Sequence, residues 1–181
     1  MNVLSPAATK ADLQGLIDAI AQASADDSMT NPLTPAQWDI VASYLLPCIL
    51  PTGHVLFTQG TTDRTLYFVE SGSLSVHFQD EKERLRLAIV GPGSVLGEGA
   101  FFSHRSRSAT VQATGPCKLW SLTAIRFTEL TNRQPAIALG LAMAAGSQGH
   151  RGIGVEQARR LRCRIGPGLG RYRFAAEPAE Q

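Results

Sequence analysis

Between Gly53 and Leu122 the chain shows a pattern in which apolar and polar residues alternate. The clearest runs are Leu74–Phe78 and Leu85–Ile89, in which every second residue is Leu, Val, Ile or Phe. A period of two places all the apolar side chains of a strand on one face. We therefore expect these runs to be half-buried strands, each with one face against a core.

Residues typical of turns separate the predicted strands. They are Gln59-Gly60, Ser71-Gly72, Asp80-Glu81-Lys82-Glu83, Gly91-Pro92-Gly93 and Gly115-Pro116. Short strands at such regular spacing are typical of antiparallel barrels and jelly rolls. The prediction is a mainly β fold with flanking helices (α+β), built as an antiparallel β-roll or jelly roll, that is, a double-stranded β-helix.

Helical spacing precedes this β region. Apolar residues in 13–20 predict a first helix, with Thr9 and Asp12 placed to cap its start. A second helix is signalled by a capping box, in which Thr34 is the N-cap, Pro35 fits the first turn and Gln37 completes the box. Its apolar stripe is formed by Trp38, Val41 and Leu45, and Pro47 is expected to stop it.

Helical spacing returns after Leu122. Thr123 predicts the cap of a short helix that runs through Asn132, and Pro135 predicts the start of another. Residues Ile137–Met143 make this last helix apolar nearly all round. Such a helix favours burial on two sides, against its own domain and against a second copy in a homodimer, although burial within one chain explains the pattern equally well.

Composition divides the chain into three parts. We expect a helical extension over 1–32, the β-roll with its flanking helices over 33–145, and a poorly ordered tail over 146–181. The tail holds 7 of the 17 glycines and 7 arginines, and a glycine in a helix interior costs about 1 kcal/mol. The main body keeps 10 basic and 12 acidic residues, so it lacks the basic face of a nucleic-acid-binding domain.

Several classes of protein are excluded by what the sequence lacks. The hydrophobic share of 44% suits a globular core, and no apolar run reaches the roughly 18 residues of a membrane span. No secretory signal opens the chain, and the three cysteines suggest neither a disulfide framework nor a metal knuckle. The expectation is a cytoplasmic protein without a membrane segment.

One segment, Gly97–Thr110, carries the residues best suited to ligand chemistry. Gly97-Glu98 offers free backbone N–H groups at the start of a short helical turn, where an anion is favoured. Nine residues later comes Arg107, whose planar guanidinium can bind a phosphate through two parallel bonds, and Ser108 adds a hydroxyl. A carboxylate beside an anion-binding arginine suits a ligand with a hydroxyl and a phosphate, such as a sugar phosphate.

This segment and the strands before it resemble the cyclic nucleotide-binding domains of catabolite activators, kinase regulatory subunits and gated channels. The likeness extends over roughly 33–145. Residues 50–60 resemble the first strands and turn of that family, 66–74 its central hairpin, and 97–110 its phosphate-binding cassette. Gly-Glu followed at cassette spacing by Arg-Ser-Ala-Thr is the most specific part.

The resemblance implies a non-enzymatic sensor that holds cAMP or cGMP inside the roll, with no metal. It assigns the ligand contacts to Gly97, Glu98, Gly99, Ala100, Arg107, Ser108 and Ala109. Glu98 would accept a hydrogen bond from the ribose 2′-hydroxyl. Arg107 would pair with the cyclic phosphate, helped by the Ser108 hydroxyl and by backbone N–H groups around Gly97 and Ala109. Serine at 108 favours cAMP.

The chain also departs from the family pattern. Gly99 stands where the cassette usually has an apolar residue, and the region expected to cap the purine falls near Gly152 and Ile153, whose side chains cannot hydrogen-bond a base. The 36 residues after Ala145 are too few and too rich in glycine for a helix-turn-helix, so no DNA-binding domain is expected. A fragment of a catabolite activator-type regulator is a further alternative.

Two other interpretations stay open. Glu98 and Arg107 could form a structural ion pair in a ligand-free roll that mediates protein contacts. A metal enzyme of the cupin type shares the architecture, but His54, His77 and His104 form no His-x-His pair and follow no ligand spacing. The sensor interpretation requires that ligand binding reposition the helices after Leu122 and change a contact with a downstream partner.

Overall fold

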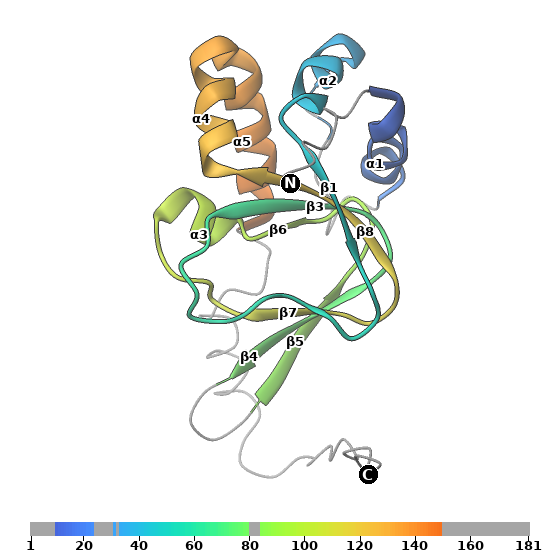
Figure 1. The fold of residues 1–181 in the computed structure, drawn as a ribbon, viewed down its shortest axis with the longest axis vertical. Helices are drawn as coiled ribbons and strands as arrows, with labels where there is room; N and C mark the ends of the chain where they lie inside the picture. The colour runs from blue at the N-terminus through green and yellow to red at the C-terminus, as the bar shows by residue number, and fades with distance from the viewer. Residues whose placement is uncertain (1–9, 24–30, 32, 80–83, 150–181) are drawn as a thin grey trace, which may run out of the picture.

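The computed structural model describes residues 10–23, 31, 33–79 and 84–149, which form two four-stranded sheets and five helices (Figure 1). The helices are α1 (Lys10–Gln22), α2 (Pro35–Ala42), α3 (Glu98–Ser103), α4 (Ala124–Arg133) and α5 (Pro135–Gly149). The strands are β1 (Leu46–Leu50), β2 (Val55–Phe57), β3 (Thr65–Ser71), β4 (Leu74–Gln79), β5 (Arg84–Val90), β6 (Val95–Leu96), β7 (Thr110–Ala113) and β8 (Cys117–Thr123).

The two sheets form a β-roll. Their strand orders are β1-β8-β3-β6 and β2-β7-β4-β5, and every pairing between neighbours is antiparallel. Helices α1, α2, α4 and α5 gather beside the first sheet, and α3 lies at one end of the roll (Figure 1). The predicted antiparallel β-roll with flanking helices is confirmed.

The apolar residues form two cores, separated by the first sheet. One core lies between this sheet and the helices, and the other lies inside the roll. Strand β3 contributes to both, because its alternate residues point to opposite faces: Leu66 and Phe68 join the helical core, whereas Val69 joins the interior of the roll. Both tryptophans, Trp38 and Trp120, are buried.

Helix α1 confirms the first predicted helix and buries Leu13, Leu16 and Ile20; Thr9 lies outside the described residues. The capping box of α2 is confirmed, because Thr34 accepts from the Gln37 N–H and the Gln37 side chain accepts from the Thr34 N–H. The predicted end of α2 is wrong.

Helix α2 ends at Ala42, and Pro47 lies within strand β1. The helix stops earlier because Ser43 caps it: its N–H and its hydroxyl both donate to the Ile40 carbonyl. Leu45 is still fully buried, but it reaches the core from the turn after the helix. The cap at Ser43 thus ends the helix four residues before Pro47.

The expected dry face of 85–89 is only partly correct, since Ile89 is 59% exposed. The cause is a bulge in the pairing of β4 with β5: Val76 lies opposite Ala88, but the next residue, His77, lies opposite Arg86. An extra residue at Leu87 moves the rest of β5 to the other face of the sheet. Ile89 therefore shares the outer face with Ser75.

The segment 66–74 was expected to form a hairpin, and this expectation is also wrong. Strand β3 belongs to the first sheet and β4 to the second, so the chain crosses between the sheets at Ser71-Gly72-Ser73 instead of pairing with itself. Turn residues alone do not distinguish a hairpin from a crossing, because both need a sharp change in chain direction.

The last two helices begin where predicted. Thr123 accepts from the Arg126 N–H as the N-cap of α4, and α5 begins at Pro135. Helix α5 continues through Gly146 to Gly149, beyond the predicted loss of order at Gly146; residues 150–181 lie outside the described residues. Helix propensity is a weak preference, and one glycine costs a helix interior only about 1 kcal/mol.

Helix α5 buries one face and exposes the other. Ile137, Ala138, Leu141, Ala144 and Ala145 are buried in the helical core, whereas Leu139 and Met143 are 62% and 67% exposed. The described part of the chain therefore covers one side of α5 and leaves the other side open. No helix in the described ranges is both long and apolar enough to cross a membrane.

Candidate ligand-binding site

The predicted cassette is folded around the short helix α3, between strands β6 and β7. Gly97 is the N-cap of α3 and has a φ of 87°, a left-handed conformation that favours glycine. A Cβ atom on Gly97 would overlap Nη1 of Arg107 and would lie 2.9 Å from the carbonyl oxygen of Thr65. Glycine at this position is therefore what lets Arg107 reach the start of α3.

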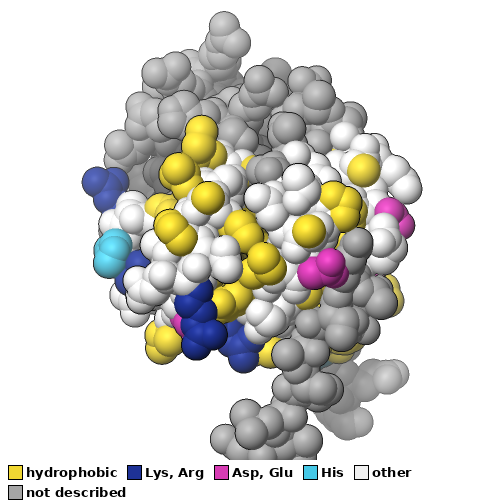
Figure 2. Space-filling view, turned by 90° about the horizontal axis from the view of Figure 1, so that it is seen from above, with side chains coloured by type: hydrophobic (Ala, Val, Ile, Leu, Met, Phe, Trp, Pro, Cys, Tyr) yellow, Lys and Arg dark blue, Asp and Glu magenta, His cyan; other side chains and the backbone are white. Residues whose placement is uncertain are grey.

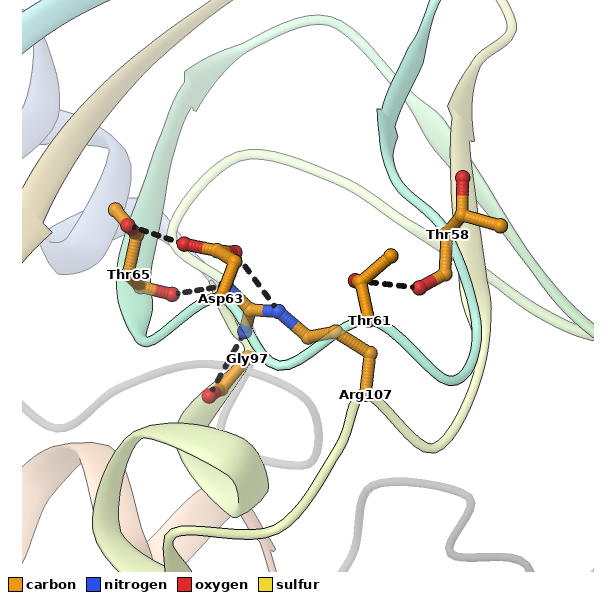
Figure 3. Close-up of polar contacts among 6 residues, drawn as sticks. All are labelled: Thr58, Thr61, Asp63, Thr65, Gly97 and Arg107. Atoms are coloured by element: carbon orange, nitrogen blue, oxygen red, sulfur yellow. Dashed lines mark hydrogen bonds and ion pairs between the residues drawn. The ribbon is translucent and has the colours of Figure 1, made fainter.

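Arg107 is the most buried charged residue among those described, with 2% of its surface exposed. Its Nε and Nη2 both donate to Oδ2 of Asp63; Nη2 also donates to the Thr65 carbonyl at 2.7 Å, and Nη1 donates to the Gly97 carbonyl at 3.1 Å (Figure 3). These four hydrogen bonds hold the guanidinium, which has five N–H donors. Its position is therefore tightly defined.

The loop before β3 encloses the main chain of Arg107 as well. The Arg107 N–H donates to the Thr61 carbonyl at 2.7 Å, and the Arg107 carbonyl accepts from the Gly60 N–H at 2.8 Å. Its guanidinium lies 4.1 Å from the centre of the Phe57 ring, at cation–π distance. The ring of Tyr67 stacks beside Phe57, 6.0 Å away.

Glu98 is half-buried at the first position of α3. Burial raises the pKa of its carboxyl group above the ordinary value, whereas the backbone N–H groups of Gly97, Gly99 and Glu98 itself and the charge of Arg107 lower that pKa by less. The N–H groups of the helix start thus favour the charged form of Glu98, but burial outweighs them. It forms no ion pair with Arg107 among the described contacts.

The other predicted site residues divide into two groups. Ala100 and Ala109 are buried, whereas Gly99 and Ser108 are exposed. A side chain at Gly99 would meet open space, so its small size does not reflect a close contact in the described structure. Helix α3 forms despite this glycine. The structure brings Gly97, Glu98 and Arg107 together, and the ligand roles of all seven residues stay predictions.

Asp63 is the residue that the sequence analysis missed. The structural ion pair considered for a ligand-free roll joins Arg107 to Asp63 and not to Glu98. Asp63 comes from the loop between β2 and β3, and its side chain is 41% exposed. A buried arginine requires an acceptor, and this could have prompted a search for an acidic residue in the loops. Periodicity gives no such signal.

Comparison with known proteins agrees with this geometry. Residues 48–134, which contain both the roll and the cassette, match the family described as the cyclic nucleotide-binding domain. The chain contains a domain of this family. The cyclic nucleotide-binding domain thus includes β1 through α4, and the described part of the chain adds α1, α2 and α5 around it.

Two curated relatives share this domain. The chain is 38% identical over 79 residues to a cAMP-dependent protein kinase regulatory subunit from Yarrowia lipolytica, covering 44% of this chain and 20% of the relative. It is 31% identical over 113 residues to the cyclic AMP receptor protein of Thermus thermophilus, covering 61% of this chain and 51% of the relative. The chain therefore spans about half or less of the length of these relatives.

A solved structure confirms the fold of the domain. The cyclic nucleotide-binding domain from Methylobacillus flagellatus KT superposes with a TM-score of 0.69 over 92% of this chain and 90% of its own, at 18% identity. At this low identity the likeness concerns the fold alone. The evidence for homology to regulatory subunits and receptor proteins is thus the sequence matches. The evidence for the architecture is the sequence matches together with the superposition.

The alternative of a cupin-type metal site receives no support from the described residues. His54 lies in an exposed turn, His77 in β4 and His104 at the end of α3, so the three histidines belong to different parts of the fold. No group of three or more His, Cys, Asp or Glu side chains that could hold a metal occurs in the described ranges.

Proposed function

We propose that this chain is a cytoplasmic, non-enzymatic sensor of cyclic nucleotide that binds cAMP in preference to cGMP at the cassette 97–110. The homology of the domain and the names of both curated relatives, which specify cAMP, support this ligand. Serine at position 108 supports the same preference. The contacts proposed for the ligand are those assigned above to Gly97, Glu98, Gly99, Ala100, Arg107, Ser108 and Ala109.

The observation that carries the proposal is the burial of a cation within the β-roll. The Arg107 guanidinium is 2% exposed, whereas the carboxylate that balances its charge belongs to Asp63, which is 41% exposed at the edge of the roll. A cyclic phosphate inside the roll would give this cation a second anionic partner. A hydrogen bond to a charged group contributes about 1.5–3 kcal/mol.

Glu98 and Ser108 would complete the contacts. The half-buried carboxylate of Glu98 is an acceptor for a ribose hydroxyl, and the cost of its burial would fall when it gains that donor. The exposed hydroxyl of Ser108, next to Arg107, is free to turn toward a phosphate oxygen. An anion and a hydroxyl on one ligand would thus meet groups of matching chemistry.

Aromatic packing offers a path from the cassette to the helices. The Phe101 ring in α3 contacts the Phe127 ring in α4 at a centroid distance of 5.3 Å and an angle of 73°. A shift of α3 on ligand binding would therefore press on α4, and α4 precedes α5 directly. We propose that this movement changes a contact with a downstream partner.

The exposed face of α5 is the surface proposed for homodimerisation. Leu139 and Met143 lie four residues apart, on one side of the helix, and both are more than half exposed. A second copy would cover them. Light scattering of Leu139→Arg should then show a monomer at concentrations where the unmodified chain is a dimer, and a concentration-independent monomer for the unmodified chain would disprove this part of the proposal.

Calorimetric titration with cAMP and with cGMP tests the function. We expect cAMP to bind more tightly than cGMP, Arg107→Ala to lose detectable binding, and Glu98→Ala to weaken binding at least about tenfold. Arg105→Ala, which changes an exposed arginine of the same segment, is the matched control and should bind like the unmodified chain. If neither nucleotide binds the unmodified chain, the roll is a ligand-free interaction module.

A further inference from the structure

A hollow lies on the outer side of the cassette, between α3 and α4. Its volume is about 220 Å³, and it is lined by Arg64, Phe101, Phe102, His104, Ala124, Phe127 and Thr128. For comparison, an apolar cavity of about 150 Å³ can hold a benzene molecule. The hollow is therefore large enough for one aromatic ring with a small substituent.

Three phenylalanine rings make the wall of this hollow aromatic. Phe101 and Phe102 meet edge to face at 5.0 Å and 86°, and Phe102 and Phe127 do so at 6.1 Å and 81°. Phe102 is 39% exposed, so part of the aromatic wall faces solvent. Edge-to-face contacts are also the favoured arrangement for an additional ring, which makes an aromatic ligand the best match.

Arg64 supplies a cation whose hydrogen-bonding capacity is largely unused. Its Nη2 donates to the Phe101 carbonyl at 3.1 Å, and its Nε is buried without an acceptor among the described residues. Arg107, by contrast, makes four such bonds. An incompletely bonded guanidinium beside an aromatic wall favours a ligand that brings a negatively charged acceptor.

The backbone at Arg64 connects this hollow to α4. The Arg64 carbonyl accepts from the Ala124 N–H at 3.2 Å, so the same residue contacts α3 through its side chain and α4 through its main chain. Figure 2, which looks onto the helical end of the molecule, shows hydrophobic side chains there, Lys, Arg and His side chains along one border, and Asp and Glu side chains elsewhere on the same face.

We propose that the hollow is a binding site for a small aromatic carboxylate, separate from the proposed nucleotide site. The aromatic ring lies against Phe101, Phe102 and Phe127, and the carboxylate accepts hydrogen bonds from Arg64. The proposal does not require that the cassette bind a nucleotide, because none of the lining residues is among those assigned to the phosphate or the ribose.

The test is a titration of the ¹⁵N-labelled full chain with phenylacetate, followed by two-dimensional NMR. We expect amide shifts that saturate and map to residues 64, 101–104 and 124–128. Phenylacetamide, which lacks the charge, and acetate, which lacks the ring, should each bind at least about tenfold more weakly. Shifts that map to the interior of the roll, or equal binding of all three compounds, would overturn the proposal.

Three variants separate this site from the roll. Arg64→Gln should weaken phenylacetate binding at least about tenfold but leave phenylacetamide binding unchanged. Thr128→Trp, at an exposed position of α4, should fill the hollow and abolish the binding of both compounds without unfolding the chain. Arg105→Gln, which changes an exposed arginine outside the lining, is the control. Unchanged phenylacetate binding in Arg64→Gln and in Thr128→Trp would overturn the proposal.

Discussion

The carboxylate of Asp63 holds the guanidinium of Arg107, although the two residues are 44 positions apart in the chain. The same loop binds the main chain of Arg107 through Gly60 and Thr61. The central cation of the cassette is thus positioned by a segment outside the cassette. Any ligand that takes Arg107 as a partner acts on a preformed arrangement, and this arrangement can be tested without a ligand.

Removing the charge of Asp63 should destabilise the ligand-free chain. Asp63→Asn leaves the buried Arg107 cation without its anionic partner, and we expect the free energy of unfolding to fall by about 1–3 kcal/mol. Urea denaturation followed by circular dichroism measures this loss. Asp39→Asn, at an exposed position of α2, is the control and should change stability by less than about 0.5 kcal/mol. Equal effects would show that Asp63 does not support Arg107.

Adding a methyl group at Gly97 should lower stability by more than the backbone strain alone explains. Gly97→Ala combines a left-handed φ with an overlap on Arg107, so we expect a loss of about 2–4 kcal/mol. Gly53→Ala has a similar φ of 78° but open space around the new Cβ, and should cost about 1–2 kcal/mol. Thermal and urea unfolding of the pair measure the difference, and a smaller loss at Gly97 would contradict the close approach of Arg107.

The half-buried carboxyl of Glu98 should make stability depend on pH. Because burial raises the pKa of Glu98, the folded chain favours the protonated form. The stability from this group is present below its unfolded pKa and is lost as the pH rises through its folded pKa. Glu98→Gln, which stays neutral, should therefore be more stable than the unmodified chain at about pH 7, and the gap should narrow toward about pH 4.

Urea midpoints of both proteins across this pH range measure the effect. A constant gap at all pH values would show that the gain comes from packing and not from ionisation. A gap that widens as the pH falls would contradict the direction assigned to the Glu98 pKa.

Removing Glu70 should destabilise the chain more than removing Lys118, because Glu70 also accepts a hydrogen bond from the indole of Trp120. The buried Trp120 N–H donates to Glu70 at 2.6 Å, and the partly exposed Lys118 pairs with the same carboxylate at 2.9 Å. Glu70→Ala should cost about 1–3 kcal/mol, because it leaves a buried donor without an acceptor. Lys118→Ala removes a partly exposed ion pair and should cost about 0–1 kcal/mol. Urea denaturation compares them, and an equal loss would refute the role of the indole bond.

Much of the fold could be predicted because its signals are local. The capping box at Thr34 and Gln37, the cap at Thr123 and the proline at the start of α5 each act within a few residues, and the structure confirms all three. Two predictions were wrong where a single residue interrupted the periodic pattern. The end of α2 came from a serine cap, and the exposure of Ile89 came from one bulged residue at Leu87.

The candidate site shows the same division. The amino-acid sequence alone determined the antiparallel β-roll and the short helix behind Gly97, because alternation, turn residues and motif spacing are properties of neighbours in the chain. Only the tertiary structure decided that Asp63 is the partner of Arg107 and that Arg64 faces an aromatic hollow. Such pairings depend on which loops the two sheets bring together. A buried charge is costly without a partner, so it pairs with an acceptor that the fold places beside it.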